Sequence, residues 1–145
     1  MIRRMVEADV QRVAGIEAEA FSSPWHPSTF HRVLEGPGAE LWVVDEEPVG
    51  VIAYGVLWCV LDQAELANIA VSPSWRGRGL GGQLLDHLLN VARGRGARTV
   101  YLEVRESNDV ARTLYRTRGF REVGARRDYY DQPREDARIM VLDLT

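Results

Sequence analysis

The stretch from Val71 to Gly82, V-S-P-S-W-R-G-R-G-L-G-G, constrains the fold more than any other part of the chain. An apolar run from Ala67 to Val71 enters it, and a segment of helical periodicity from Leu80 to Ala92 leaves it. The stretch therefore joins a strand to the start of a helix. Glycines let the backbone take positive φ and approach a ligand closely, and the first N–H groups of a helix have no partner within it. This arrangement favours an anion such as a pyrophosphate at the helix N-terminus.

The same loop carries side-chain donors that suit a phosphate. Arg76 and Arg78 supply guanidinium groups that a purely structural turn does not need. A flexible glycine-rich turn with solvated arginines is the alternative interpretation. If the loop binds an anion, the candidate contacts are Arg76, Gly77, Arg78, Gly79, Leu80, Gly81 and Gly82.

The periodicity of the remaining chain predicts a mixture of strands and helices. Strands are expected over 2–5, 41–44, 49–61, 64–71, 99–104, 120–126 and 138–144, and helices from about 9, from 27, over 80–92 and over about 110–118. The strand at 64–71, the glycine loop, the helix and the strand at 99–104 form a βαβ crossover, which should be right-handed with parallel strands. The polar stretch 128–136 is predicted to be a loop within a terminal antiparallel pair.

Composition excludes several classes of function. A chain of 145 residues suits a single domain over 1–145, and its net charge of −3 argues against general attraction to nucleic acid. There is no signal-peptide core and no apolar run of membrane-spanning length, so we expect a cytoplasmic protein with neither nucleic acid nor membrane as partner. All 18 basic residues are arginine, so the chain has no lysine for a Walker-type phosphate site or for a Schiff-base mechanism. The single cysteine and three scattered histidines predict no metal site.

Two phosphate-binding fingerprints fit the loop. Gly77, Gly79 and Gly82 match the dinucleotide-binding pattern G-x-G-x-x-G, and Glu103 follows at about the distance of its ribose-binding acid, roughly twenty residues on. In the dinucleotide-binding fold, the first glycine directly follows a strand, and most strands of the sheet come after the glycine loop in the sequence. Here five residues intervene, and half of the chain precedes the loop. The second pattern, R-x-x-G-x-G, begins at Arg76.

Through the second pattern the sequence resembles the GCN5-related N-acetyltransferase superfamily. Further motifs resemble its bacterial RimI type, the ribosomal-protein N-terminal alanine acetyltransferases: N-I-A-V-S-P, L-E-V-R-x-S-N, A-x-x-L-Y-x-x-x-G-F, and R-R-D-Y-Y with E-D-A-R-I-M. Together they span residues 65–141, and P-W-H-P-S-T-F also fits. The resemblance implies an α/β fold with a mixed, mostly antiparallel sheet of about seven strands, a parallel splayed pair in its middle, and about four flanking helices.

The resemblance also implies a reaction and its partners. Acetyl-CoA would be the cosubstrate, without a metal, and the acceptor would be the N-terminal segment of a ribosomal protein, most specifically the N-terminal alanine of the eighteenth small-subunit protein. The enzyme would be a monomer or weak dimer. An acetyltransferase for small-molecule amines or other protein N-termini, and a non-catalytic acyl-CoA-binding module, are the alternatives. Retention of both Glu103 and Tyr115 speaks against the binding module, which needs neither.

By resemblance, each reacting group has a candidate residue. Glu103 would be the general base, and Tyr115 the general acid that protonates the departing thiolate. A salt-bridged strand glutamate, and a tyrosine that packs on Phe120 at a helix end, are the structural alternatives. Asn108 would contact the cofactor or simply cap its helix. The candidate backbone contacts for the pantetheine arm are Ile69, Ala70 and Val71.

The acceptor side has weaker signals. Trp25 in the early loop, with Tyr129 and Tyr130 in the late one, are candidate walls of a peptide groove, and packing anchors are the alternative. An α-amine with a pKa near 7.7 is partly neutral at cell pH, whereas lysine has a pKa near 10.4. A carboxylate base therefore favours an α-amine acceptor.

Overall fold

Strand β4 (Gln63–Val71), helix α3 (Leu80–Gly94) and strand β5 (Thr99–Arg105) form the predicted crossover. In the computed structural model, which describes residues 1–131 and 133–144, β4 and β5 are parallel neighbours. They lie in the middle of a seven-stranded sheet of order β1-β2-β3-β4-β5-β7-β6, in which the other neighbours are antiparallel. The predicted mixed sheet with a central parallel pair is confirmed, and this strand order excludes the doubly wound dinucleotide-binding fold.

The remaining elements agree with the predicted order and differ mainly at their ends. The strands are β1 (Ile2–Arg4), β2 (Ala39–Glu46), β3 (Gly50–Val60), β6 (Arg121–Tyr130) and β7 (Glu135–Asp143). The helices are α1 (Val10–Ala20), α2 (Pro27–Leu34) and α4 (Asp109–Thr117), with short 3₁₀ turns at Glu7–Asp9 and Pro73–Trp75. No helix in the described part of the chain is long and apolar enough to cross a membrane.

The predicted late loop is wrong in its extent. β6 continues to Tyr130, and β7 already begins at Glu135, opposite it. The sequence suggested a loop because polar residues dominate this stretch. The strands tolerate those residues because β6 is an edge strand with most of its side chains exposed, and Asp128 takes a positive φ of 52° where the register shifts. Tyr129 and Tyr130 are therefore strand residues.

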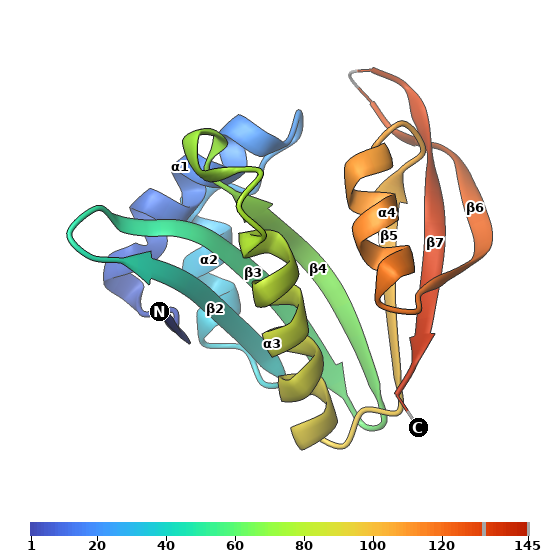
Figure 1. The fold of residues 1–145 in the computed structure, drawn as a ribbon, viewed down its shortest axis with the longest axis horizontal. Coiled ribbons are helices and arrows are strands. Elements are labelled where there is room, and N and C mark those ends of the chain that lie inside the picture. The colour runs from blue at the N-terminus through green and yellow to red at the C-terminus, as the bar shows by residue number, and fades with distance from the viewer. Residues whose placement is uncertain (132, 145) are drawn as a thin grey trace.

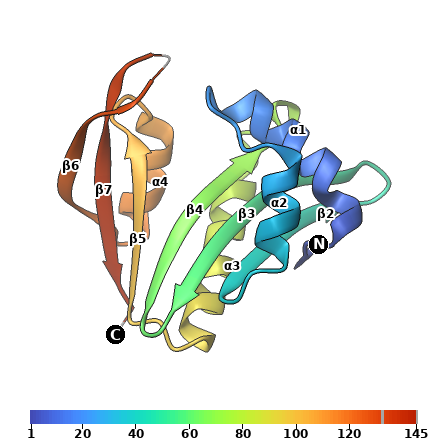
Figure 2. The same ribbon diagram turned by 180° about the vertical axis from the view of Figure 1, so that it is seen from behind.

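The helices divide between the two faces of the sheet. Helices α1 and α2 cover one face of β2 to β4, and α3 crosses the opposite face (Figures 1 and 2). Helix α4 lies over β5 to β7 on the same face as α3. The face of β5 that is turned away from α4 is consequently left open beside α1 and α2.

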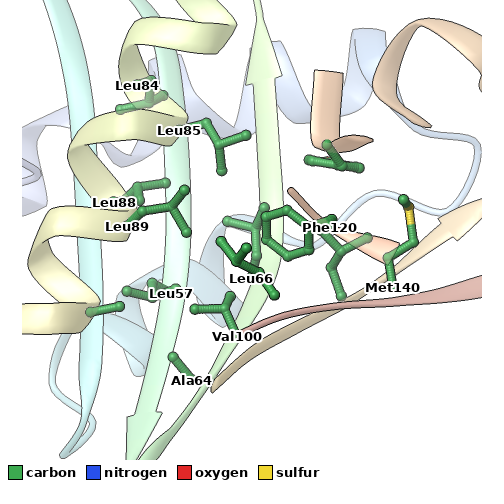
Figure 3. Packing of buried hydrophobic residues seen from close by; sticks show 14 of the residues in the cluster. Leu57, Ala64, Leu66, Leu84, Leu85, Leu88, Leu89, Val100, Phe120 and Met140 are labelled. Atoms are coloured by element: carbon green, nitrogen blue, oxygen red, sulfur yellow. The ribbon is translucent and has the colours of Figure 1, made fainter. Parts of the chain in front are cut away.

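The apolar stripe predicted for α3 is confirmed and anchors the glycine loop. Its leucines are buried against strand residues from both sides of the parallel pair (Figure 3). Each fully buried leucine contributes about 1.5–3 kcal/mol relative to an exposed one. The start of α3 is thereby held at a fixed position against the sheet. The residues in contact include Leu84, Leu85, Leu88, Leu89, Leu57, Leu66 and Val100.

Candidate active site

The central parallel pair separates partway along its length. Pairing between β4 and β5 runs from Gln63 opposite Thr99 to Leu66 opposite Leu102. Beyond that point β4 pairs with β3, while β5 pairs with β7, and the two ribbons diverge (Figure 1). A register shift in β4, between Leu66 and Asn68, falls where the separation begins.

The separation leaves one edge of β4 available to a ligand. Ile69, Ala70 and Val71 pair with β3 on one side, and the parallel register with β5 has ended on the other. Backbone N–H and C=O groups on such an edge can hydrogen-bond an extended ligand as a further strand would. The structure thus places the three predicted pantetheine contacts at a suitable edge, and their role stays a prediction.

The glycine loop has the predicted conformation at two of its four glycines. Gly77 has φ of +80°, and Gly79, the N-cap of α3, has φ of +78°. These left-handed conformations require glycine far more than other residues do. Gly81 and Gly82 lie inside the helix without a positive φ, so their backbone conformation does not require glycine.

Gly82 instead lies against a residue that the sequence analysis missed, and a larger residue here would require this flexible side chain to move. A Cβ at this position would collide with the guanidinium of Arg118, which follows α4. Arg118 pairs with Asp86 of α3, with 3.1 Å between Nε and Oδ1. The ion pair joins α4 to the first turns of α3. No local sequence pattern signals a contact between residues 32 positions apart.

Both arginines of the loop have local partners. The Nε atom of Arg76 donates to the carbonyl oxygen of Val71 at 3.1 Å. The guanidinium of Arg78 lies 4.5 Å from the ring centre of Trp75, a cation–π contact. These contacts give both arginines a structural role within the loop. Phosphate binding by them stays a prediction.

Glu103 is a partly buried carboxylate on the face of β5 that is turned away from α4. Its neighbours Leu102 and Val104 belong to the core beneath α3, so alternation along the strand directs Glu103 to the opposite face. Its side chain is 15% exposed, and its buried Oε2 atom has no hydrogen-bond partner. Arg126 of β6 lies 3.5 Å from that oxygen, outside hydrogen-bonding geometry. An acceptor oxygen without a hydrogen bond is available to take a proton from a substrate.

The same face carries two further ionisable groups that sequence reasoning missed. Glu65 of β4 lies opposite Tyr101 of β5, and both line a cavity of about 260 Å³. Burial, followed by the charge of Glu103, raises the pKa of Glu65. Burial and then Glu65 raise the pKa of Tyr101. The period-2 alternation of β5 and the parallel register would have placed all three groups on one face.

Tyr115 occupies the end of α4 with the predicted capping geometry. The Phe120 N–H donates to the Tyr115 carbonyl at 3.1 Å, and the Gly119 N–H donates to that of Arg116 at 2.9 Å. This is a Schellman motif, and the ring centres of Tyr115 and Phe120 lie 5.7 Å apart. The packing role is therefore confirmed. Burial first, and then Tyr130, raise the pKa of Tyr115, so its phenol stays protonated at neutral pH.

Tyr130 links the two candidate catalytic residues electrostatically. Burial, followed by the charge of Glu103, raises the pKa of Tyr130 to about 12, and Tyr130 in turn raises that of Tyr115. Glu103 lies on the face of β5 that is turned away from α4, whereas Tyr115 belongs to α4, so the two residues lie on opposite faces of the sheet. Tyr129, 48% exposed, lies beside Tyr130.

Trp25 and Asn108 show the packing and capping contacts that were their structural alternatives. The ring of Trp25 packs 5.2 Å from that of Phe30 in α2. The Asn108 side chain accepts from the Ala111 N–H at 3.2 Å, as an N-cap does. Contacts of these residues with substrates stay predictions. Among residues 1–131 and 133–144, no three metal-ligating side chains are grouped to hold an ion.

Comparison with known proteins places this geometry in a family. The sequence profile of the acetyltransferase (GNAT) family matches residues 10–120. Proteins named ribosomal protein bS18-alanine N-acetyltransferase from Haemophilus ducreyi and Escherichia coli K12 are 38% and 37% identical. Each alignment covers 99% of this chain, with 100% and 97% of the respective relative.

Solved structures agree with the sequence relatives. The crystal structure of the Escherichia coli ribosomal-protein-S18-alanine N-acetyltransferase has a TM-score of 0.92 at 37% identity, covering 100% of this chain and 94% of that one. Arabidopsis thaliana NAA60 in complex with acetyl-CoA shares the fold, with a TM-score of 0.89 at 21% identity over 99% of this chain and 98% of that chain. The chain belongs to the GNAT family of acetyltransferases.

Proposed function

We propose that this protein transfers the acetyl group of acetyl-CoA to the free α-amine at the N-terminus of a protein, specifically the N-terminal alanine of ribosomal protein bS18. The observation that carries the proposal is the buried, unbonded Oε2 atom of Glu103, which follows directly after the last residue of β5 that pairs with β4, together with the protonated phenol of Tyr115 that α4 supplies on the other face of the sheet. The full-length relatives that bear this name support the choice of acceptor.

The residues present fit the cofactor. The β4 edge at Ile69 to Val71 offers backbone groups to a pantetheine arm, and the N–H groups from Gly77 to Gly82 surround the start of α3, where the helix dipole favours a pyrophosphate. Asn108, which caps the start of α4, is proposed to contact the cofactor as well. Bound acetyl-CoA would supply an acetyl thioester, which an amine can attack.

Glu103 and Tyr115 divide the proton transfers of the reaction. Glu103 takes a proton from the attacking amine, directly or through water, as the new N–C bond forms. Tyr115 gives its phenolic proton to the thiolate that leaves when the C–S bond breaks. The two residues would act from different faces of the sheet, with the acceptor on the side that carries α1 and α2 and the thiol on the side that carries α3 and α4.

A carboxylate base such as Glu103 favours an α-amine over a lysine side chain as the acceptor. An α-amine has a pKa of about 7.7, whereas deprotonating lysine at the same pH requires almost three more units, roughly 4 kcal/mol. Tyr129 and Tyr130, beside Glu103 at the end of β6, are proposed to line the path of the acceptor chain, and Trp25 to flank it from the α1–α2 loop.

The acceptor is tested with matched peptides. We expect a peptide that begins Ala-Arg with a free N-terminus to be acetylated, and the same peptide blocked at its N-terminus but carrying a lysine to be labelled at least about tenfold more slowly, because of the pKa difference. Mass spectrometry with fragmentation locates the acetyl group. A small-molecule amine panel serves as the comparison. Faster labelling of lysine, or of a small amine, would remove the proposed acceptor.

The cofactor site is tested at Gly79. Valine at φ of +78° is strained, so G79V should displace the first N–H groups of α3 and weaken acetyl-CoA binding by about tenfold or more. Asparagine tolerates the left-handed conformation, so G79N should weaken it less. Gly94 lies at the far end of α3 without a positive φ, and G94A is the control. Calorimetry that gave equal affinity for folded G79V and wild type would exclude the glycine loop from cofactor binding.

A further inference from the structure

Arg105, the last residue of β5, contacts three separate parts of the chain. Its Nη2 atom donates to Oγ of Ser22 at 2.6 Å, and its Nη1 atom donates to the carbonyl oxygen of Pro133 at 3.0 Å and to Oε1 of Glu135 at 3.2 Å. The guanidinium also lies 4.3 Å from the ring centre of Tyr130. Its side chain is 22% exposed.

These contacts join the two halves of the divided sheet. Ser22 belongs to the loop between α1 and α2, residues 21–26, in which Trp25 packs against a core cluster that includes residues of β3 and β4. Pro133 and Glu135 belong to the hairpin of β6 and β7, on the other side of the opening. Figure 2 shows the α1–α2 loop and this hairpin on opposite sides of the end of β5. One side chain therefore spans the end of the sheet at which β4 and β5 have separated.

The connection is anchored on both sides. In the α1–α2 loop, the Trp25 N–H donates at 2.9 Å to Oε2 of Glu17, a fully buried carboxylate of α1. On the hairpin side, Glu135 also accepts from the Ser107 N–H. The hydrogen bond from Ser107, with a further contribution from Arg105, holds the pKa of Glu135 below its usual value, so this ion pair persists at neutral pH.

We propose that Arg105 is a positioning residue that clamps the α1–α2 loop to the β6–β7 hairpin and so fixes the walls against which the acceptor chain lies. The inference rests on the proposed function. Glu103 and Arg105 are two residues apart on β5, hence on the same face and about 7 Å apart along the strand. An extended acceptor covers that distance in about two residues. The clamp therefore acts on the part of the acceptor that follows the reacting amine.

Arginine is specifically suited to this position. Its planar guanidinium carries five N–H donors and can stack on an aromatic ring while it bonds acceptors in several directions. Lysine keeps the charge but places three donors on a single nitrogen, so R105K should retain one of these contacts and lose the others. Ser22→Ala removes only the hydrogen bond between Arg105 and the α1–α2 loop.

The test compares R105K and S22A with wild type, using a free N-terminal hexapeptide. R105K should raise the peptide KM about tenfold and S22A a few-fold, with kcat and the Kd of acetyl-CoA nearly unchanged. Arg127, an exposed arginine of β6, provides the control R127K. Unchanged peptide KM in both variants would overturn the clamp. So would a parallel loss of kcat, acetyl-CoA affinity and thermal stability, because that pattern indicates a structural role alone.

Hydrogen exchange separates this inference from the proposed function. In R105K, amides of segments 21–26 and 133–136 should exchange faster, and those of α3 should not. This readout needs no acceptor. If wild type labels no N-terminal peptide, the proposed function fails, and the clamp is still judged by exchange. If wild type is active but both segments exchange at the same rate in R105K as in wild type, the clamp fails and the function stands.

Discussion

Replacing Glu103 by glutamine should lower turnover by about 10²-fold or more, while the affinity for acetyl-CoA stays unchanged. Glutamine keeps the size of the side chain but cannot accept a proton from the amine. The buried Oε2 atom has no hydrogen bond to lose, so the fold should tolerate the change. Steady-state rates with a free N-terminal peptide, with calorimetry for acetyl-CoA, measure both quantities.

The neighbouring carboxylate provides a matched control for this variant. Glu65 shares the face and the buried surroundings of Glu103, but it belongs to β4. If negative charge on this face were all that mattered, E65Q would slow turnover as much as E103Q does. A specific base at Glu103 predicts a much smaller effect of E65Q. Equal losses in the two variants would refute the assignment of the base.

Replacing Tyr115 by phenylalanine should lower turnover on a similar scale, about 10²-fold, with normal folding. Phenylalanine preserves the contact with Phe120, and the Schellman motif uses only backbone groups. The variant therefore removes only the phenolic hydroxyl group, and with it the proton that Tyr115 would donate. Thermal unfolding checks the packing, and kcat checks the acid.

Tyr101 is the control for the acid. Burial also raises the pKa of its phenol, but it lies on β5, on the face opposite α4. Y101F should consequently retain far more activity than Y115F. Near-normal kcat in a folded Y115F protein would leave Tyr115 with a packing role only.

Local patterns in the sequence predicted most of the fold. The apolar runs, the glycine loop and the α3 stripe are short-range signals, and each one fixed an element or a junction. Because a parallel crossover has one favoured hand, the central pair followed from the order of these elements. The splayed opening and the roles of Glu103 and Tyr115 came instead from resemblance to a family.

The contacts that complete the site join residues far apart in the sequence. Arg126 of β6 reaches Glu103 of β5 across β7, which lies between these two strands, and Arg105 reaches Ser22, 83 positions away. Periodicity reports the face of an element but not its neighbours. The extent of β6 was missed for a related reason: an exposed edge strand has no apolar alternation to mark it.

The central claim is that Glu103 and Tyr115 move the protons of acetyl transfer from opposite faces of the opening. The pH profile of kcat/KM for wild type, E103Q and Y115F tests it most directly. In wild type, kcat/KM should fall on the acid side. Loss of the Tyr115 proton should not lower it below about pH 10, because burial raises the pKa of that phenol above its ordinary value. E103Q should be slow even at a pH at which the acceptor α-amine, with a pKa of about 7.7, is mostly neutral, and Y115F should be slow at every pH. Wild-type profiles and rates in both variants would contradict the account and leave a protein that only binds acetyl-CoA.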